Sequence, residues 1–261
     1  MRPAPAPVTV IVPCFNEADG MPTLLSRLDR LHDEEVSDWR FVFVDDGSSD
    51  DTFSLLVAAS RTRSWIDIVR HPENLGLGEA IRTGFRAADS PIICTMDSDC
   101  TYPPERLKEL AEGVARGADI VTASAWHPST GASTGNPVRL YLSRAVSGLY
   151  KMLLGQDVYT FTCLFRAYRR EQVVDCRFIT RGFGAVAEIM LRGIVAGADV
   201  REVPMRLERR IYGESKLKIT DSIVAHVALI SLTTFLVVGS RVRRALAPRF
   251  GWAFREQRRG A

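Results

Sequence analysis

The amino-acid sequence predicts an α/β protein whose sheet is mostly parallel and carries helices on both faces. In the first half of the chain, short runs rich in β-branched and aromatic residues alternate with segments of helical periodicity. These runs are almost entirely apolar, which is typical of parallel strands buried on both faces. The length of 261 residues, with 46% apolar and 25% charged residues, suits one large domain or one domain with an appendage.

The first half contains alternating predicted strands and helices. The predicted strands are Val8–Val12, Phe41–Val44, Ile66–Val69, Ile92–Met96 and Ile120–Ser124. The predicted helices are Gly20–Asp33, Thr52–Ser60, Glu79–Ala88 and Pro104–Arg116. Polar motifs follow the first, second and fourth strands, at the carboxyl edge where such sheets bind ligands.

The second half is organised differently. A loop rich in Ser, Thr, Gly and Pro precedes segments that read in turn as helix, strand, helix and strand: Val138–Leu154, Thr160–Tyr168, Phe183–Ala196 and Val200–Leu207. A polar segment over 209–218 then leads to the apolar stretch Ile223–Val238. We expect one domain over residues 1–218 and a membrane-associating helix with a basic tail over 219–261.

Charge and cysteine content narrow the class of protein. From Gly239 onward there are seven Arg and one Glu, so the rest of the chain has a net charge of −3 and the tail is basic. A basic tail favours a phosphate-rich partner, either a membrane or a nucleic acid. The five cysteines (Cys14, Cys94, Cys100, Cys163 and Cys176) have no metal-ligand spacing, and the first residues lack the apolar core of a signal peptide. We therefore expect reduced thiols in a cytosolic protein.

Asp97-Ser98-Asp99 follows a predicted buried strand directly. In extended chain, carboxylates at positions i and i+2 point to the same side and can hold a hard divalent cation together with phosphate oxygens. The alternative is an acidic loop that caps the helix opened by Pro103-Pro104-Glu105.

Three further groups suggest a nucleotide-diphosphate ligand. Asp45 and Asp46, at a strand end, can accept hydrogen bonds from a ribose or a base, although taken alone they are better explained by a turn with a cap for the helix at Thr52. Arg210 and Lys216 flank a glycine and can close over a diphosphate, or form a solvated basic loop. Arg139 and Ser143, one helical turn apart, can share one phosphate; the alternative is an exposed Arg and a helical Ser.

Known nucleotide motifs are absent. Gly76 and Gly78 are followed by Ile81 where a dinucleotide fingerprint needs a third glycine, and there is no P-loop pattern. The four histidines form no ligand pattern, and we treat them as structural, with His127 a mild exception because it lies in the loop that follows the Asp97-Ser98-Asp99 motif.

Five segments, in order and spacing, resemble the motifs of family-2 GT-A glycosyltransferases. They are VIVPCFNE (10–17), VDDGSSDDT (44–52), NLGLGEAIRTG (74–84), MDSDCTYPPE (96–105) and RIYGESK (210–216). The resemblance covers about residues 8–220. Within the family, the sequence most resembles the dolichol- or polyprenyl-phosphate mannosyltransferases.

The resemblance implies a GT-A fold, which is Rossmann-like, and inverting transfer of a sugar, with mannose favoured. It also implies a nucleotide-sugar donor (GDP-mannose or a UDP-sugar), a polyprenyl phosphate acceptor, and Mg²⁺ or Mn²⁺. By position, the donor would be bound by Pro13, Phe15, Asn16, Glu17, Val44, Asp45, Asp46, Met96 and Ser98. The metal would be held by Asp97, Asp99 and Thr101, the donor diphosphate by Arg210 and Lys216, and the acceptor phosphate or the sugar by Arg139 and Ser143. We expect Asp97, Asp99, Arg210 and Lys216 to be the catalytic residues.

Three departures from the family pattern concern the sugar and the acceptor. Where the family often reads SRY, this chain reads Ser124-Ala125-Trp126, so an Arg expected near the phosphates is missing. The usual DxTSGFR is replaced by residues 160–166, and Thr101 and Tyr102 replace Gln and His in the metal loop.

The acceptor decides whether a general base is needed. A phosphate monoester is already anionic at pH 7, so it attacks without a strong base. A hydroxyl acceptor, such as a glycan or a secondary metabolite, would need a base, for which Glu188 is the only candidate; alternatively, Glu188 is an exposed or capping helix residue. A third hypothesis is a nucleotide-sugar-binding partner subunit without turnover.

The apolar stretch Ile223–Val238 has 16 residues without a formal charge. As a helix it would be about 24 Å long, short of the roughly 30 Å of a bilayer core. Because both flanks are basic, we expect a helix that lies in or dips into the cytoplasmic leaflet, against an anionic membrane surface and not a nucleic acid. The alternative is a buried core or dimer helix.

Overall fold

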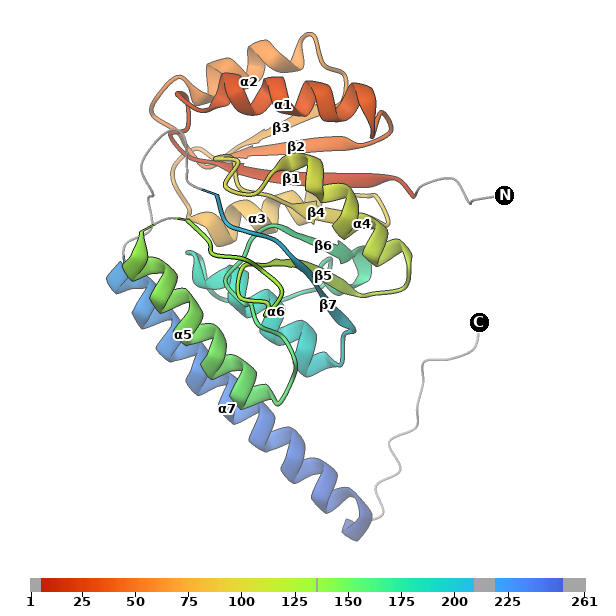
Figure 1. The fold of residues 1–261 in the computed structure, drawn as a ribbon, viewed down its shortest axis with the longest axis vertical. Coiled ribbons are helices and arrows are strands. Elements are labelled where there is room, and N and C mark those ends of the chain that lie inside the picture. The colour runs from red at the N-terminus through yellow and green to blue at the C-terminus, as the bar shows by residue number, and fades with distance from the viewer. Residues whose placement is uncertain (1–5, 135, 209–218, 251–261) are drawn as a thin grey trace.

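The computed structural model describes residues 6–134, 136–208 and 219–250 (Figure 1). Within these ranges, seven strands form one sheet in the order β3-β2-β1-β4-β6-β5-β7. The strands are β1 (Val8–Cys14), β2 (Arg40–Asp45), β3 (Ile66–Arg70), β4 (Ile92–Thr95), β5 (Ile120–Ser124), β6 (Arg166–Arg169) and β7 (Val200–Pro204). The helices are α1 (Met21–Glu34), α2 (Thr52–Ser60), α3 (Leu77–Ala87), α4 (Leu107–Ala115), α5 (Pro137–Leu154), α6 (Gly184–Ala196) and α7 (Ile219–Phe250), with short 3₁₀ turns at Pro104–Arg106 and Arg170–Gln172.

The sheet is mostly parallel, as predicted. β1 pairs in parallel with β2 and β4, β2 with β3, and β5 with β7. The exception is β6, which runs antiparallel between β4 and β5. Its residue Arg166 lies in register with both Thr95 of β4 and Thr122 of β5, so the carboxyl ends of β4 and β5 reach the same edge on either side of it.

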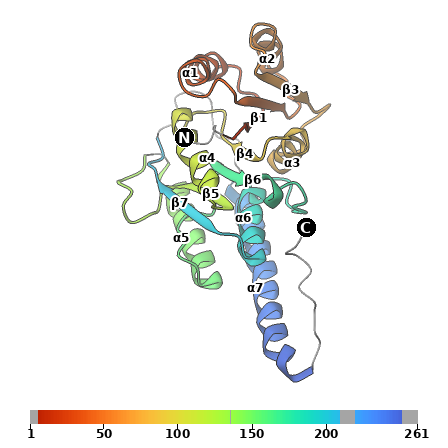
Figure 2. The ribbon, with the colours of Figure 1, turned by 90° about the vertical axis from the view of Figure 1, so that its right-hand side faces the viewer.

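Two hydrophobic layers enclose the sheet, and the strands alternate between them. Val10 and Val12 of β1 belong to the layer under α1, α2 and α4, whereas Ile11 faces the layer under α3 and α6. The same alternation places Phe43 in the first layer and Val44 in the second. Figures 1 and 2 show these helices on opposite faces of the sheet. Burial on both faces explains the continuous apolar runs in the sequence.

The predicted strand Thr160–Tyr168 is largely wrong. Only Arg166–Arg169 forms a strand, and the residues before it form a loop whose backbone amides bind side chains instead of a neighbouring strand. Tyr159 N and Thr160 N donate to Glu202, and Phe161 N donates to Ser147 Oγ (3.2 Å). The alternating pattern therefore reflects loop side chains that are buried against α5 and the sheet.

Helices α5 and α7 lie side by side (Figure 1). Asn136 caps α5 by accepting from Val138 N and Arg139 N, and Tyr150 of α5 makes a 2.9 Å hydrogen bond with His226 of α7. α7 is longer than the apolar stretch that predicted it. Among the described residues, no helix combines the length and hydropathy needed to cross a membrane. The domain division at residue 218 stays a prediction.

All five cysteines are free, as predicted. Burial raises the pKa of the Cys14 thiol well above its usual range and that of Cys163 to about 12. These thiols are therefore protonated at neutral pH, which makes them poor nucleophiles and poor metal ligands.

Candidate active site

The loops after β1 and β2 are joined into one wall at the carboxyl edge of the sheet. Asn16 N donates to Ser48 Oγ (2.9 Å), Ser49 N donates back to Asn16 Oδ1 (2.8 Å), and Glu17 N donates to Thr52 Oγ1 (2.8 Å). Asn16 has a positive φ of 53°, a conformation that asparagine tolerates better than most residues. The sequence-predicted group Asn16 and Glu17 is therefore rigidly placed before any ligand binds.

Other predicted donor-site residues surround this wall. Pro13 is buried at the end of β1 in register with Val44, and Phe15 is half-buried. The side chains of Val44 and Met96 are fully buried in the two core layers. Their contact with a donor therefore stays a prediction.

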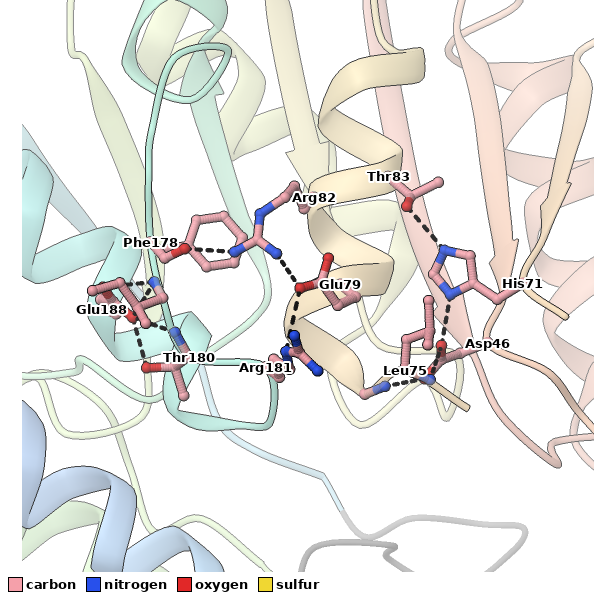
Figure 3. Close-up of polar contacts among 12 residues, drawn as sticks. Asp46, His71, Leu75, Glu79, Arg82, Thr83, Phe178, Thr180, Arg181 and Glu188 are labelled. Atoms are coloured by element: carbon pink, nitrogen blue, oxygen red, sulfur yellow. Dashed lines mark hydrogen bonds and ion pairs between the residues drawn. The ribbon is translucent and has the colours of Figure 1, made fainter. Parts of the chain in front are cut away.

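Asp46 has a structural role that the sequence did not indicate (Figure 3). Its carboxylate accepts from His71 Nδ1 (2.7 Å), Leu75 N (2.9 Å) and Gly76 N (2.8 Å), and His71 Nε2 is 2.9 Å from Thr83 Oγ1. Both oxygens of this buried side chain are used to hold the loop before α3. In this structure the Asp46 carboxylate positions that loop, and its contact with a nucleoside stays a prediction.

The two carboxylate oxygens of Asp45 have different partners. Its Oδ1 accepts from Ser48 N (3.2 Å), whereas Oδ2 has no hydrogen-bond donor among the described residues. Arg70 Nε lies 3.1 Å from this oxygen as an ion pair without hydrogen-bond geometry, and its half-exposed guanidinium packs over the Phe53 ring. A buried carboxylate oxygen without a donor is costly, so this position suits a ligand N–H or O–H.

The metal motif lies at the end of β4. Asp97 and Asp99 are half-buried, and Ser98 is buried. The chain turns at Ser98–Asp99, so the assumption of an extended chain is wrong here; Asp99 Oδ1 accepts from both Thr101 N (3.0 Å) and Thr101 Oγ1 (2.9 Å), which closes the turn. The following 3₁₀ turn has no side-chain cap, so the capping alternative is not what this structure contains.

The donor set fits Mg²⁺ or Mn²⁺. Two carboxylates and the Thr101 hydroxyl are the oxygen ligands that these hard cations prefer. Among the described residues, no cluster of three or more His, Cys, Asp or Glu side chains can form a complete protein cage. An ion held here would therefore complete its coordination with water and phosphate oxygens, as is usual for Mg²⁺.

The predicted acceptor residues Arg139 and Ser143 lie on α5. Arg139 is half-buried, and Ser143 Oγ accepts from the indole Nε1 of Trp126 (3.1 Å) and contacts Thr162 Oγ1 (2.7 Å). Thr162 lies in the loop between α5 and β6, and β6 pairs with β4, which Asp97 follows. Arg210 and Lys216 lie outside the described residues.

Glu188 is neither exposed nor a free base. It is buried and accepts from Thr180 N (2.8 Å) and Oγ1 (2.6 Å), as Figure 3 shows. It also accepts from Ile179 N (3.0 Å) and from Arg192. Burial alone would raise the pKa of Glu188, but the bonds from Thr180 and Ile179 and the Arg192 guanidinium lower it overall. A carboxylate so stabilised as an anion is a poor proton acceptor.

Gly76 and Gly78 serve packing. A Cβ on Gly78 would lie 2.3 Å from Thr180 O, and one on Gly76 would lie 2.7 Å from Arg181 O. Gly78 N donates to Arg181 O, and Arg181 also pairs with Glu79 (Figure 3). The glycines therefore let the start of α3 dock against the loop that Glu188 holds.

The sequence analysis did not predict the role of Arg166. Its fully buried guanidinium donates to Thr122 Oγ1, Val186 O and Phe161 O, and so connects β5, α6 and the loop before β6. An arginine at the end of an apolar run was the signal that could have indicated it.

The fold and the acidic pair after β4 are those of a GT-A glycosyltransferase. The chain belongs to glycosyl transferase family 2, whose model matches residues 9–176. An undecaprenyl-phosphate 4-deoxy-4-formamido-L-arabinose transferase of Erwinia tasmaniensis is 31% identical over 87% of this chain and 68% of its own length. The protein of the same name from Pseudomonas fluorescens is 28% identical over 97% of this chain and 78% of its own.

A similar fold occurs in glucosyl-3-phosphoglycerate synthase of Mycobacterium tuberculosis, solved in complex with Mn²⁺ and UDP-glucose. The TM-score is 0.66 and the sequences are 19% identical, over 89% of this chain and 78% of that one. This likeness establishes the fold, and the matches to the transferases establish that relatives of this chain are named as polyprenyl-phosphate sugar transferases.

Proposed function

We propose that this protein transfers a sugar, with inversion, from a nucleotide-diphosphate sugar to a polyprenyl phosphate. The observation that carries the proposal is the state of Glu188. The only base candidate that the sequence offered is buried and bound by four donor groups. An acceptor that is already an anion needs no such base. The names of the relatives support the same acceptor.

The residues divide the chemical work. Asp45 would accept from the nucleoside, and Asp97, Asp99 and Thr101 would hold a Mg²⁺ or Mn²⁺ ion. When bound, such an ion neutralises the diphosphate that leaves. Arg139 and Ser143 would orient the acceptor phosphate, and Arg210 and Lys216, outside the described residues, would bind the diphosphate.

In the reaction, a phosphate oxygen of the acceptor forms a bond to the anomeric carbon. The bond from that carbon to the diphosphate oxygen breaks, and the nucleoside diphosphate departs with the electron pair. Two anions must approach each other in line, so fixed cations that hold them contribute most to the rate.

The sugar is a finer question. The resemblance favoured mannose from GDP-mannose, whereas the names of the relatives favour a 4-deoxy-4-formamido-L-arabinose donor. The fold neighbour was solved with UDP-glucose, which supports a uridine nucleotide. We propose the formamido sugar as the first donor to test and mannose as the second.

The test is a donor panel with undecaprenyl phosphate and either Mg²⁺ or Mn²⁺. Labelled sugar that becomes extractable into organic solvent would support the proposal. Label that moves only to a water-soluble acceptor would favour a hydroxyl acceptor, and binding without any turnover would favour a partner subunit. Either result would contradict the proposal.

We also propose that the protein works at the cytoplasmic face of a membrane, without crossing it. Helix α5 carries a stripe of exposed apolar side chains, including Tyr141 (73% exposed) and Met152 (75%). α7 beside it exposes Val224 (70%) and Phe235 (75%). α5 contains three basic residues and no acidic one, which suits an anionic lipid surface.

A further inference from the structure

We propose that Trp126 forms one wall of the subsite for the transferred sugar and that its indole ring determines which sugar is accepted. This inference rests on the proposed function, because it takes a nucleotide-diphosphate sugar as the ligand of the sheet's carboxyl edge. Trp126 is half-buried and lies two residues beyond the end of β5.

The sheet register places Trp126 near the acidic pair. Thr95 of β4 and Thr122 of β5 pair with the same residue of β6, Arg166. Two residues further along each strand lie Asp97 and Ser124, about 10 Å apart across one intervening strand. Trp126 follows Ser124 by two residues. The indole therefore emerges beside the position where the diphosphate and its sugar must lie.

Hydrogen bonds hold both the backbone and the indole ring of Trp126. Trp126 N donates to Thr160 Oγ1 (3.2 Å), which also bonds Ser124 Oγ (2.9 Å). At the other end, Trp126 Nε1 donates to Ser143 Oγ (3.1 Å), and Ser143 bonds Thr162 Oγ1 (2.7 Å). Because both the backbone and the indole N–H are held, little side-chain entropy remains to be lost on binding.

The bonded partner of the indole places it between the two reactants. Ser143 is on the helix assigned to the acceptor phosphate, and Asp97 is at the site assigned to the diphosphate. In-line displacement puts the sugar between these two groups, so its ring passes the indole. A flat aromatic face with one polar edge is suited to the C–H face of a sugar ring.

The neighbouring residue removes an alternative. Ala125, where the family pattern has Arg, is buried and carries no charge. The wall at this position therefore recognises shape and apolar surface, and not phosphate. Substitutions of Trp126 should change binding of the sugar and leave binding of the nucleoside diphosphate intact.

The first test measures tryptophan fluorescence of the full chain with Mn²⁺. The probes are UDP-linked 4-deoxy-4-formamido-L-arabinose, UDP-glucose and GDP-mannose, each compared with its own sugar-free diphosphate. At least one sugar nucleotide should quench more than its diphosphate in the wild type and in Trp65→Phe, a matched control beside the amino end of β3. The extra quenching should be lost in Trp126→Phe. Extra quenching that survives in Trp126→Phe, or that no sugar produces in the wild type, would overturn the inference.

The second test is calorimetry on variants whose fold is verified by circular dichroism. Trp126→Ala should weaken binding of the quenching sugar nucleotide on the order of tenfold, and change binding of the diphosphate less than twofold. Trp126→Phe, which keeps a flat ring, should lose less. Equal weakening of both ligands would mean that Trp126 only supports the fold.

These outcomes are separable from the proposed function. Failure to transfer any sugar to undecaprenyl phosphate would refute the acceptor, while sugar-dependent quenching at Trp126 would remain. Loss of that quenching with transfer intact would refute the role of Trp126 alone.

Discussion

Asp97 and Asp99 differ in their immediate surroundings, although both belong to the acidic pair. Asp99 also closes the turn by accepting two bonds from Thr101. We predict that Asp97→Ala and Asp99→Ala each lower the rate of transfer at least a hundredfold, because a lost charge contact at the departing diphosphate is worth roughly 3 kcal/mol. Initial rates of transfer from a saturating donor check this.

The matched control for the acidic pair is Asp67→Asn. Asp67 is an exposed aspartate on β3 that pairs with Arg40 at the surface. It should keep its transfer rate within twofold, since exposed ion pairs contribute little. Full activity of either site variant, or of the wild type in EDTA, would contradict the metal role.

Asp45 and Asp46 provide a second comparison between neighbouring aspartates. Asp46→Ala would leave the buried His71 ring and the amides of Leu75 and Gly76 without their acceptor, so we expect a loss of about 3 kcal/mol in the free energy of unfolding. Asp45→Ala should lower the free energy of unfolding by only about 1 kcal/mol. It should weaken nucleotide binding more than Asp46→Ala does. Urea unfolding and calorimetry with UDP measure the two effects; the reverse ranking in stability would show that the roles are exchanged.

These two residues also show the limit of sequence analysis at this scale. The acidic motif indicated carboxylates at a strand end, and both are there. Which one is used by the fold depends on His71 and on two backbone amides further along the chain. No local pattern around Asp46 reports contacts with those residues.

The docking of α3 on the loop at Thr180 requires that residue 78 is a glycine, which has no side chain. We predict that Gly78→Ala lowers the free energy of unfolding by at least about 2 kcal/mol, because its Cβ would meet two backbone carbonyl oxygens that cannot move independently. Gly148→Ala on α5 is the matched helical control: no atom lies within 4 Å of its Cβ position, so it should stabilise by about 0.5–1 kcal/mol. Equal effects in thermal unfolding would contradict this packing.

Glu188 joins the same loop to α6. The lowered pKa of Glu188 means that its contribution to stability is present above the unfolded value of about 4.3 and is lost as pH falls through the folded value. Glu188→Gln should therefore be less stable than the wild type at pH 7, and the difference should shrink below about pH 4.3. Unfolding midpoints across this pH range check the sign.

The Glu188→Gln variant also tests whether Glu188 acts as a general base. Since a structural carboxylate does not accept the reaction proton, Glu188→Gln should keep the acid limb of the pH–rate profile in place. A shift of that limb, with the fold intact, would restore Glu188 as a base.

Elements were predicted best where burial alone decides them. The strands of the first half follow from continuous apolar runs, and α2 was predicted with its observed bounds. The segment 160–168 misled because polar and apolar residues alternate at its start, although nearly all of them are buried and the amides of residues 159–161 bind Glu202 and Ser147 instead of a strand. Such side-chain acceptors lie far along the chain, so periodicity cannot reveal them.

For the whole molecule, α5 and α7 place their exposed apolar side chains at helical spacing. On α5, Val138, Tyr141, Leu149 and Met152 fall on one side of the helix, opposite the buried Ser147 and Tyr150. The two helices lie parallel beside each other below the sheet (Figures 1 and 2). α5 and α7 begin at the same end, near the carboxyl edge of the strands. A bilayer against them would bring a lipid phosphate to the site.

This arrangement predicts how membrane binding divides between the helices and the basic tail. Removal of residues 239–261 deletes seven Arg and one Glu, and at about 1 kcal/mol per Arg near an anionic surface it should reduce sedimentation with anionic liposomes strongly.

Tyr141→Ser with Met152→Ser should weaken binding to both anionic and neutral liposomes, because it removes exposed apolar area and no charge. High salt should release the wild type more readily than it releases the truncated protein, which keeps the three basic residues of α5 but has lost the seven Arg of the tail. Arg40→Ser is the control, because Arg40 lies on β2 and pairs with Asp67 of β3, away from α5 and α7. This variant should bind as the wild type does. If the double variant and the truncated protein both sediment fully, neither surface attaches the protein to the membrane.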